Sequence, residues 1–239
     1  MFQNLFGDKK KIPFSSFVDY ALYSSKGYYK RESMISKQGD FLTSPNISKV
    51  YAQTLANFLV SKGFNDYFRE NNESTDVINL IELGSHEGIL MKDIVDYLKT
   101  FYKTEIYDKI KLVIVEKNLN LHENIFKQLS NHKERLLVTD SLSSTEINSK
   151  KAIIFCNEFL DALPFERCVI KEDKLYQINV EFKDGKFIES LDEANLNLEK
   201  KIKEYKLNSI NNYFFEIAIE EYEKLFQTII DKFSKVFFL

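Results

Sequence analysis

The sequence has 239 residues, of which 44% are hydrophobic and 29% charged, and its formal net charge at pH 7 is -3. This length predicts one large domain, or a domain with an appendage, that buries a sizeable core. The near balance of acidic and basic residues disfavours a protein that mainly binds nucleic acid, because such proteins carry a strongly basic face.

Membrane insertion and secretion are also disfavoured. No apolar run reaches the roughly 18 residues of a membrane span. Charged residues at Asp8 and Lys9–Lys11 interrupt the N-terminal stretch, which does not resemble a signal peptide. We therefore expect a soluble cytoplasmic protein. Two cysteines and three histidines show neither the spacing of a disulfide framework nor that of a metal site, so no bound metal is expected.

The N-terminal segment, residues 1–72, is predicted to be helical and to contain one polar loop. Apolar residues of Phe14–Tyr23 recur on one helical stripe, and Ile47–Val60 repeats this pattern. Between the two helices lies Gly39–Pro45, which reads GDFLTSP. One explanation of this loop is structural, because Ser44 followed by proline is typical of a helix N-cap.

Short apolar runs alternate with amphipathic stretches between residues 73 and 168. This alternation is the pattern of βαβ units and predicts an α/β core with a mostly parallel sheet. Right-handed crossovers place the carboxyl ends of all such strands at one edge. The predicted strands are Val77–Leu83, Lys111–Glu116, Leu136–Thr139 and Ala152–Cys156, and the predicted helices are Ile89–Tyr102 and Leu119–Leu129.

Beyond this core, residues 169–212 are predicted to form an antiparallel and helical insertion. Asp184-Gly185 between two β-type runs is typical of a hairpin turn. A helix is expected over Asn195–Tyr205 and a second one over Phe214–Phe233. Residues 213–239 would thus return to the core as a helix followed by a strand that begins near Lys235.

Polar residues follow the first three predicted strands. Gly84 and Gly88 lie in a turn that opens a helix, where glycines let a ligand approach the backbone amides, although a plain tight turn explains them equally well. Glu116 ends the second strand, where a carboxylate can bind the hydroxyls of a ribose, and Asp140 follows the third. Each alone is more simply a solvated carboxylate or a turn former. Together at one sheet edge they indicate a nucleoside cofactor.

Four motifs in order give the sequence a resemblance to a known family. Asn157–Pro164 reads NEFLDALP, and it is preceded by Gly27–Tyr29, by Gly39–Phe41 and by Thr43–Pro45. In these motifs the sequence resembles the MidA-type S-adenosylmethionine-dependent methyltransferases, which include the mitochondrial complex I assembly factor. The resemblance implies a Rossmann-like class I methyltransferase fold, S-adenosylmethionine as cofactor and protein arginine as substrate, in particular an arginine of a respiratory complex I subunit.

The resemblance also implies where the cofactor binds. Its contacts are expected from the glycine turn, from the acids after the second and third strands and from the GDFLTSP loop. These residues are Glu82, Gly84, His86, Gly88, Glu116, Asp140, Gly39, Asp40, Thr43 and Ser44.

Catalysis is expected from the NEFLDALP motif. An arginine guanidinium is always cationic, so carboxylates are suited to hold it and to offset its charge. Glu158 and Asp161 are the predicted pair, with Asn157 as a polar positioning residue. The structural alternative is that Asn157 and Asp161 cap the turn.

The sequence departs from the family pattern at two places. His86 stands where the family usually has the middle glycine, and its side chain would either crowd the methionine end of the cofactor or donate a hydrogen bond to its carboxylate. Family members also continue past the strand that begins near Ser234, so the C-terminal strands are expected to be missing from this sequence.

These departures leave two other classes of function open. One is a catalytically inactive assembly or binding protein that retains the methyltransferase fold. The other is an oxidoreductase that binds NAD, because a glycine turn followed by an acid after the second strand also serves that cofactor. Ligand binding distinguishes the three classes. A methyltransferase binds S-adenosylmethionine, an oxidoreductase binds NAD, and an inactive assembly protein binds neither.

Overall fold

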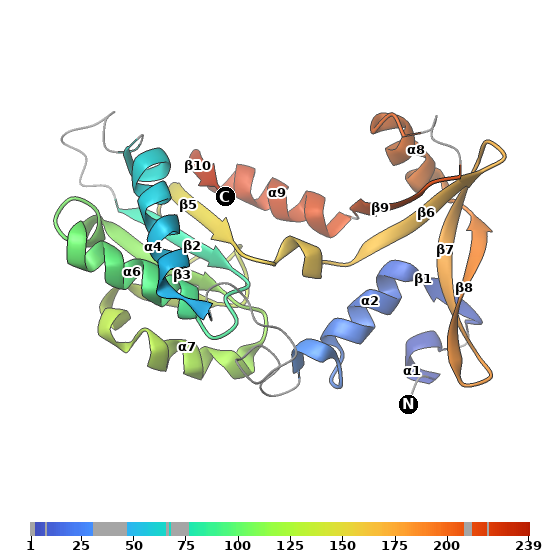
Figure 1. The fold of residues 1–239 in the computed structure, drawn as a ribbon, viewed down its shortest axis with the longest axis horizontal. Helices are drawn as coiled ribbons and strands as arrows, with labels where there is room; N and C mark the ends of the chain where they lie inside the picture. Colours follow the sequence, from blue (N-terminus) through green and yellow to red (C-terminus); the bar gives the residue numbers. More distant parts are fainter. Residues whose placement is uncertain are drawn as a thin grey trace. The chain divides into compact units, whose positions relative to one another are not determined.

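The computed structural model describes residues 3–7, 9–30, 47–65, 67, 77–207, 212–218 and 220–239. The chain forms two compact units (Figure 1): Met1–Arg31 joins Asp161–Lys224 in the first, and Glu32–Leu160 joins Leu225–Leu239 in the second. The division into segments 1–72, 73–168, 169–212 and 213–239 remains a prediction, and the compact units cut across it.

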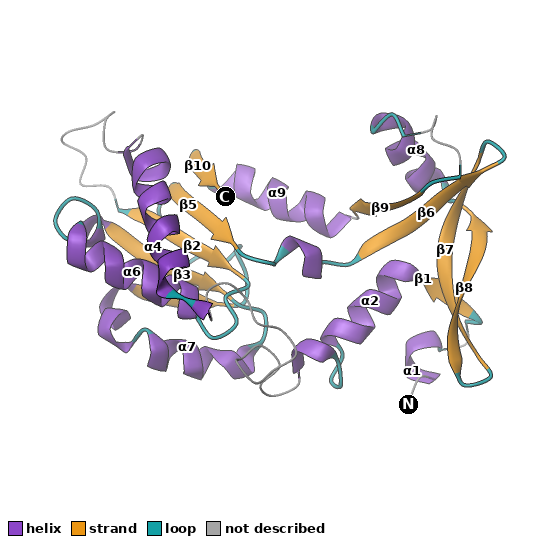
Figure 2. Cartoon of the chain, in the orientation of Figure 1, coloured by secondary structure: helices purple, strands orange, loops and turns teal. Residues whose placement is uncertain are grey.

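The second unit is built on a parallel sheet with the strand order β10-β5-β2-β3-β4 (Figure 2). Its strands are β2 (Ile78–Leu83), β3 (Ile110–Val115), β4 (Leu136–Thr139), β5 (Lys151–Cys156) and β10 (Lys235–Phe238). Each of the strands predicted from an apolar run is present within about one residue of its expected bounds. The central strand β2 is buried at all six positions, and it is apolar at all of them except Asn79 and Glu82.

Alternate residues of these strands face two separate cores. Leu80, Leu112 and Ile153 belong to a cluster that includes buried residues of α4, α6 and α7. Ile81, Val113 and Ile154 belong to the opposite cluster, which contains Ile229 and Phe233 near the end of α9. This alternation follows from the period of two in a strand, and it gives the unit a helix–sheet–helix layering.

Helices cover the sheet where the apolar spacing predicts them. In α6, the buried residues recur at the three- and four-residue spacing of one helix face: Leu90, Met91, Ile94, Val95 and Leu98. The helical segments of this unit are α4 (Lys49–Phe58), π-helical η2 (Leu59–Phe64), α6 (Ile89–Phe101), α7 (His122–Gln128) and the short 3-10 helices η3 (Tyr107–Lys109), η4 (Leu119–Leu121) and η5 (Ser130–Arg135). Two further segments, η6 (Leu160–Ala162) and α9 (Glu220–Lys232), each span the boundary between the units.

The first unit is an antiparallel sheet in which β1, β7, β6 and β9 pair in that order and β8 pairs with β7. The predicted hairpin is present: β7 and β8 are joined at Asp184 and Gly185, which both have positive φ. The elements are α1 (Gln3–Phe6), β1 (Lys11–Pro13), α2 (Phe14–Tyr23), η1 (Tyr28–Lys30), β6 (Phe165–Lys171), β7 (Lys174–Lys183), β8 (Lys186–Glu193), α8 (Leu196–Glu204) and β9 (Phe214–Ala218).

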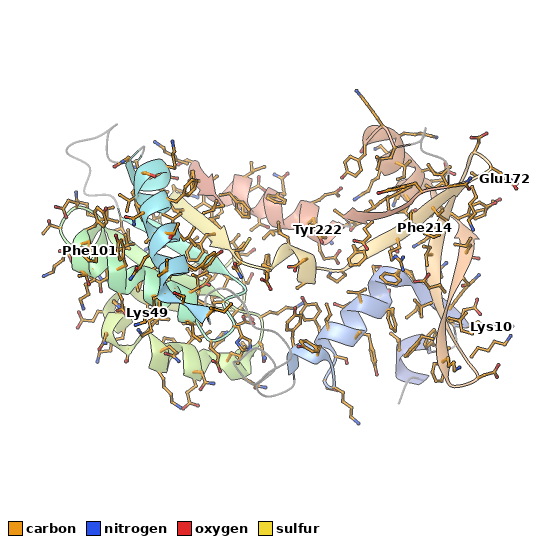
Figure 3. The ribbon with its side chains drawn as sticks, viewed as in Figure 1. Lys10, Lys49, Phe101, Glu172, Phe214 and Tyr222 are labelled. Carbon is orange, nitrogen blue, oxygen red and sulfur yellow. The ribbon has the colours of Figure 1, made fainter. Side chains whose placement is uncertain are left out.

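The prediction of a single helix over Phe214–Phe233 is wrong at its start. Residues 214–218 form β9, which pairs antiparallel with β6, and α9 begins at Glu220. Phe215 and Ile217, two residues apart, pack into the core of this unit, whereas Phe214 is exposed on the other face (Figure 3). When an alternating pattern of only five residues directly precedes a helical pattern, it is easily mistaken for the start of the helix.

A buried polar cluster fixes α2 against the antiparallel sheet. The Ser15 hydroxyl donates to Oε1 of the buried Glu166 on β6, and Gln177 Nε2 of β7 donates to Glu166 Oε2 at 3.0 Å. Because both carboxylate oxygens have partners, burying this charge is compensated.

Among the helices of the described residues, none has the length and apolar character needed to cross a bilayer.

Candidate functional site

Four parallel strands of the second unit end level with one another. Leu83 of β2 pairs with Val115 of β3 and with Cys156 of β5, and Val115 pairs in turn with Thr139 of β4. The residues that follow these strand ends are Gly84, Glu116, Asp140 and Asn157. The sheet register therefore brings most of the predicted cofactor and catalytic motifs to one edge, as ligand sites in open α/β sheets require.

The glycine turn after β2 closes tightly over the NEFLDALP motif. Gly84 has a φ of +67°, and a Cβ built on it would lie 2.6 Å from Cδ2 of Phe159. The Gly84 amide also donates to the Val115 carbonyl at 2.9 Å, which continues the ladder between β2 and β3. Gly88 is the N-cap residue of α6. The turn thus has the close packing that only a residue without a side chain permits.

Glu116 organises the turn and the start of the next loop. Its Oε2 accepts the amide of His86 at 3.0 Å, and its Oε1 accepts the amide of Asn118 at 2.8 Å. An ionised carboxylate has about four lone-pair sites, so each oxygen retains capacity for one more hydrogen bond. Glu116 is therefore oriented by the backbone and still able to bind two hydroxyl groups.

His86 occupies its turn position in the left-handed region. Its φ is +52°, a conformation that a residue with a side chain adopts at a cost. Burial lowers the pKa of the imidazole, although the charges of Glu87 and Glu116 oppose this shift. The side chain is consequently neutral at pH 7. The prediction that His86 contacts a cofactor remains a prediction.

Glu82 supports the helix start from within the core. Its side chain is buried, and its carboxylate accepts a hydrogen bond from the backbone amide of Met91 in the first turn of α6. Within the described part of the chain, Glu82 Oε2 and the buried Ser85 Oγ have no hydrogen-bond partner. Burial raises the pKa of Glu82 to about 8, against the opposing effect of the Met91 hydrogen bond. The predicted cofactor contact of Glu82 thus has a structural role beside it.

The raised pKa of Glu82 makes unfolding depend on pH. The folded state favours the protonated carboxyl. The contribution of Glu82 to the stability of the fold is therefore fully present below the unfolded pKa near 4.5, and it is lost as the pH rises towards about 8. We expect the free energy of unfolding to fall by roughly 1 kcal/mol per pH unit across this interval, and Glu82→Gln to remove that slope. Urea denaturation at pH 5 to 8 measures both. Glu105→Gln, at an exposed carboxylate, is the control; equal slopes in wild type and Glu82→Gln would contradict the expectation.

The start of the NEFLDALP motif carries a contact to α4. The hydroxyl of Tyr51 donates to Oδ1 of Asn157 at 2.8 Å. Burial raises the pKa of the Tyr51 phenol, and the negative charge of Glu158 raises it further. Glu158 is exposed and has a φ of +48°. An amide, a phenol and a carboxylate are thereby grouped after β5 at the edge where Gly84 and Glu116 lie.

The remaining predicted site residues differ in their placement. Asp140 follows β4 at the common edge and is exposed. Asp161 is exposed and belongs to the first unit, where its charge helps to raise the pKa of Tyr222, a shift that burial dominates. Gly39, Asp40, Thr43 and Ser44 lie outside the described residues, and the N-cap of the described helix α4 is Ser48. In the described ranges, no three His, Cys, Asp or Glu side chains are grouped as a metal site.

Sequence reasoning missed three residues of this edge. Tyr51 is separated from Asn157 by 106 residues, so no local spacing could join them. Ser85 lies between Gly84 and Gly88, and its sequence position alone does not show that its hydroxyl is buried. Phe159 lies inside the NEFLDALP motif, where a bulky residue next to the predicted Glu158 is a signal that the motif also packs.

A family model with the description "Putative S-adenosyl-L-methionine-dependent methyltransferase" matches residues 59–239. Among solved structures, a chain from Burkholderia thailandensis with bound S-adenosyl-homocysteine aligns with a TM-score of 0.73 and 21% identity. That alignment covers 96% of this chain and 58% of the other. A second crystal structure from that organism aligns with a TM-score of 0.71 and 22% identity. The predicted fold class is confirmed.

Curated relatives match at a similar level of identity but over shorter stretches of the chain. The protein arginine methyltransferase NDUFAF7 homolog of Drosophila melanogaster, named as mitochondrial, is 22% identical over 186 residues, which cover 71% of this chain and 41% of the relative. Mitochondrial NDUFAF7 of Mus musculus is 25% identical over 161 residues, covering 60% of this chain and 36% of the relative. The chain thus spans less than half the length of these relatives.

The predicted cytoplasmic location is wrong. The curated relatives are named as mitochondrial proteins, which contradicts it. The prediction rested on the absence of a signal peptide and of a membrane span. Neither absence identifies a compartment, because the two features report only on secretion and on membrane insertion.

Proposed function

Because this chain belongs to the family of S-adenosyl-L-methionine-dependent methyltransferases whose model matches residues 59–239, we propose that it methylates an arginine side chain of a protein. That match confirms three predictions: the family, S-adenosylmethionine as the cofactor, and methyltransferase as the enzyme class. The observation that best supports the proposal is the common edge at which Gly84, Glu116 and Asn157 follow strands that end level.

The residues at this edge fit the cofactor. Glu116 has acceptor capacity for the two ribose hydroxyls while two backbone amides hold it in place. Gly84 has no side chain, so a ligand can come close to the turn. The buried Ser85 hydroxyl has no partner among the described residues and is suited to bind a polar group of a ligand. When bound, S-adenosylmethionine supplies an electrophilic methyl group on a sulfonium.

The acceptor side of the site is proposed to be the start of the NEFLDALP motif. Glu158 is an exposed carboxylate beside Asn157, so it can bind a cationic guanidinium, hold its reacting nitrogen in place and offset its charge. Asp161 remains a proposed second carboxylate. Asp140 as an adenine contact, and Asp40, Thr43 and Ser44 as cofactor contacts, likewise remain proposals.

The names of the relatives support the class of substrate. The Drosophila and mouse proteins are named protein arginine methyltransferases, and the sequence resemblance to a complex I assembly factor suggests a respiratory complex I subunit as the protein partner. The chain is proposed to act on one arginine of such a subunit.

The role of Glu116 is tested with a ligand that lacks one hydroxyl. Removing the 2′-hydroxyl of S-adenosyl-homocysteine is expected to weaken binding to wild type about tenfold, since a hydrogen bond to a charged group is lost. In Glu116→Gln both ligands should bind weakly and almost equally, because an amide replaces one accepting oxygen. Titration calorimetry gives the four affinities. Glu134→Gln on the exposed face of η5 is the control; the same ratio in wild type and Glu116→Gln would exclude the ribose contact.

Activity is tested with tritium-labelled S-adenosylmethionine and unmethylated complex I subunits. Label recovered as methylarginine after acid hydrolysis is the expected result, and an acceptor with the target arginine changed to lysine should take up none. A folded chain that binds the subunits but neither binds the cofactor nor transfers a methyl group would instead establish the second candidate, an inactive assembly protein. His86 is the observation that favours that candidate, because it brings a side chain into the glycine turn.

A further inference from the structure

Tyr51 lies in the first turn of α4, which begins at Lys49. The N-cap residue is Ser48, whose side chain accepts the Val50 amide at 3.1 Å. Ala52 and Ala56, on the face of α4 towards the sheet, are 1% and 0% exposed. Tyr51 itself is 37% exposed. Its ring is therefore held by a fixed backbone while its hydroxyl end reaches the solvent-facing edge after β5.

The hydrogen bond to Asn157 determines what the Tyr51 hydroxyl offers. A phenol has one hydrogen to donate and two lone pairs with which to accept. Tyr51 donates its hydrogen to Asn157 Oδ1 at 2.8 Å, so the remaining capacity of the oxygen is that of an acceptor. Burial, together with the charge of Glu158, raises the pKa of Tyr51, which keeps the phenol protonated in this arrangement.

A guanidinium group presents only N–H donors, in a planar fork, and it therefore needs more than one acceptor. Glu158 supplies a carboxylate directly after Asn157 in the chain. Tyr51 supplies a neutral oxygen that its hydrogen bond to Asn157 orients. Asn157 Oδ1 already accepts the hydrogen of Tyr51. Asn157 therefore affects the substrate indirectly, by orienting the Tyr51 hydroxyl.

We propose that Tyr51 is a substrate-contacting residue of the methyltransferase site, whose hydroxyl oxygen accepts a hydrogen bond from the target guanidinium beside Glu158. Asn157 is then the positioning residue that fixes the direction of that oxygen. The inference rests on the proposed function, because it names a contact of the same arginine substrate, and it adds a residue from α4 to a site otherwise built from the ends of strands.

The test compares Tyr51→Phe with wild type in the full chain. N-acetyl-L-arginine methylamide is titrated as the probe in the presence of S-adenosyl-homocysteine and followed by NMR. We expect the Kd for this probe to rise about tenfold, as for the loss of one hydrogen bond to a cation, and the affinity for S-adenosyl-homocysteine to stay unchanged. In methyl transfer to the protein acceptor, KM should rise more than kcat falls.

Tyr97→Phe is a matched control, because the Tyr97 hydroxyl of α6 also donates to an asparagine, Asn57 Oδ1 of α4, at 3.2 Å, and neither residue belongs to the loops that follow the strands. It should change none of these values. Asn157→Ala is the second variant; it leaves the Tyr51 hydroxyl in place without its partner and should weaken the probe several-fold.

The outcomes separate the inference from the function on which it rests. Wild type that binds and methylates arginine, with Tyr51→Phe indistinguishable from it, would overturn the role of Tyr51 and leave the proposed function intact. Wild type that neither binds the probe nor methylates the acceptor would overturn the proposed function itself. Equal losses in Tyr51→Phe and Tyr97→Phe would show a general effect of removing tyrosine hydroxyls and would also overturn the inference.

Discussion

Glu158→Gln is expected to slow methyl transfer to an arginine acceptor at least about 100-fold, because the site loses the charge that compensates the guanidinium. Glutamine has almost the same shape, but it is neutral and turns an N–H donor towards another donor. The affinity for S-adenosylmethionine should be unchanged, since Glu116 and the glycine turn are intact. Single-turnover transfer of a labelled methyl group measures the rate, and calorimetry measures the affinity.

Glu172 provides a closely matched control for this variant. It is exposed, its φ is +49° against +48° for Glu158, and it lies in the turn between β6 and β7 (Figure 3). Glu172→Gln therefore removes a carboxylate from the same backbone conformation at a place where no role in catalysis is proposed. Its activity should equal that of wild type. Full activity of Glu158→Gln, or an equal loss in the two variants, would remove Glu158 from the mechanism.

The parallel sheet was predictable because its physics is local to each strand. A strand buried on both faces is mostly apolar, as β2 is apart from Asn79 and Glu82, and such runs alternate with helices whose apolar residues recur on one face. The rule that crossovers are right-handed then places the strand ends together. This reasoning groups the site residues after β2, β3 and β5 from the sequence alone.

The parts that were missed depend on contacts between distant segments. β9 is a strand because β6 offers it a pairing edge, and five residues of alternating pattern do not reveal that partner. Tyr51 joins the site through a hydrogen bond to a residue 106 positions away. Glu82 holds a helix start because the first turn of α6 packs against it, whereas its sequence position near the end of a strand predicts only a ligand contact. Spacing along the chain carries none of this information.

Gly84→Ala is expected to lower the free energy of unfolding by about 3 kcal/mol, as the sum of a strained backbone and an overpacked contact. The φ of +67° disfavours any residue with a Cβ, and that Cβ would meet the Phe159 ring at 2.6 Å. The ring cannot retreat freely, because it packs against the apolar cluster on one face of the parallel sheet. Urea denaturation measures the loss, and affinity for S-adenosylmethionine should fall with it.

Two further variants divide this loss into its causes. Gly185 has a φ of +78° with no atom within 4 Å of a built Cβ, so Gly185→Ala should show the backbone cost alone, about 1–2 kcal/mol. In a Phe159→Ala background, the cost of Gly84→Ala should fall to a similar value. An unchanged cost there would show that Phe159 is not what excludes the side chain. The predicted coupling has a functional consequence, because Phe159 directly follows Glu158: the packing that keeps the turn at Gly84 closed also fixes the backbone that presents the carboxylate.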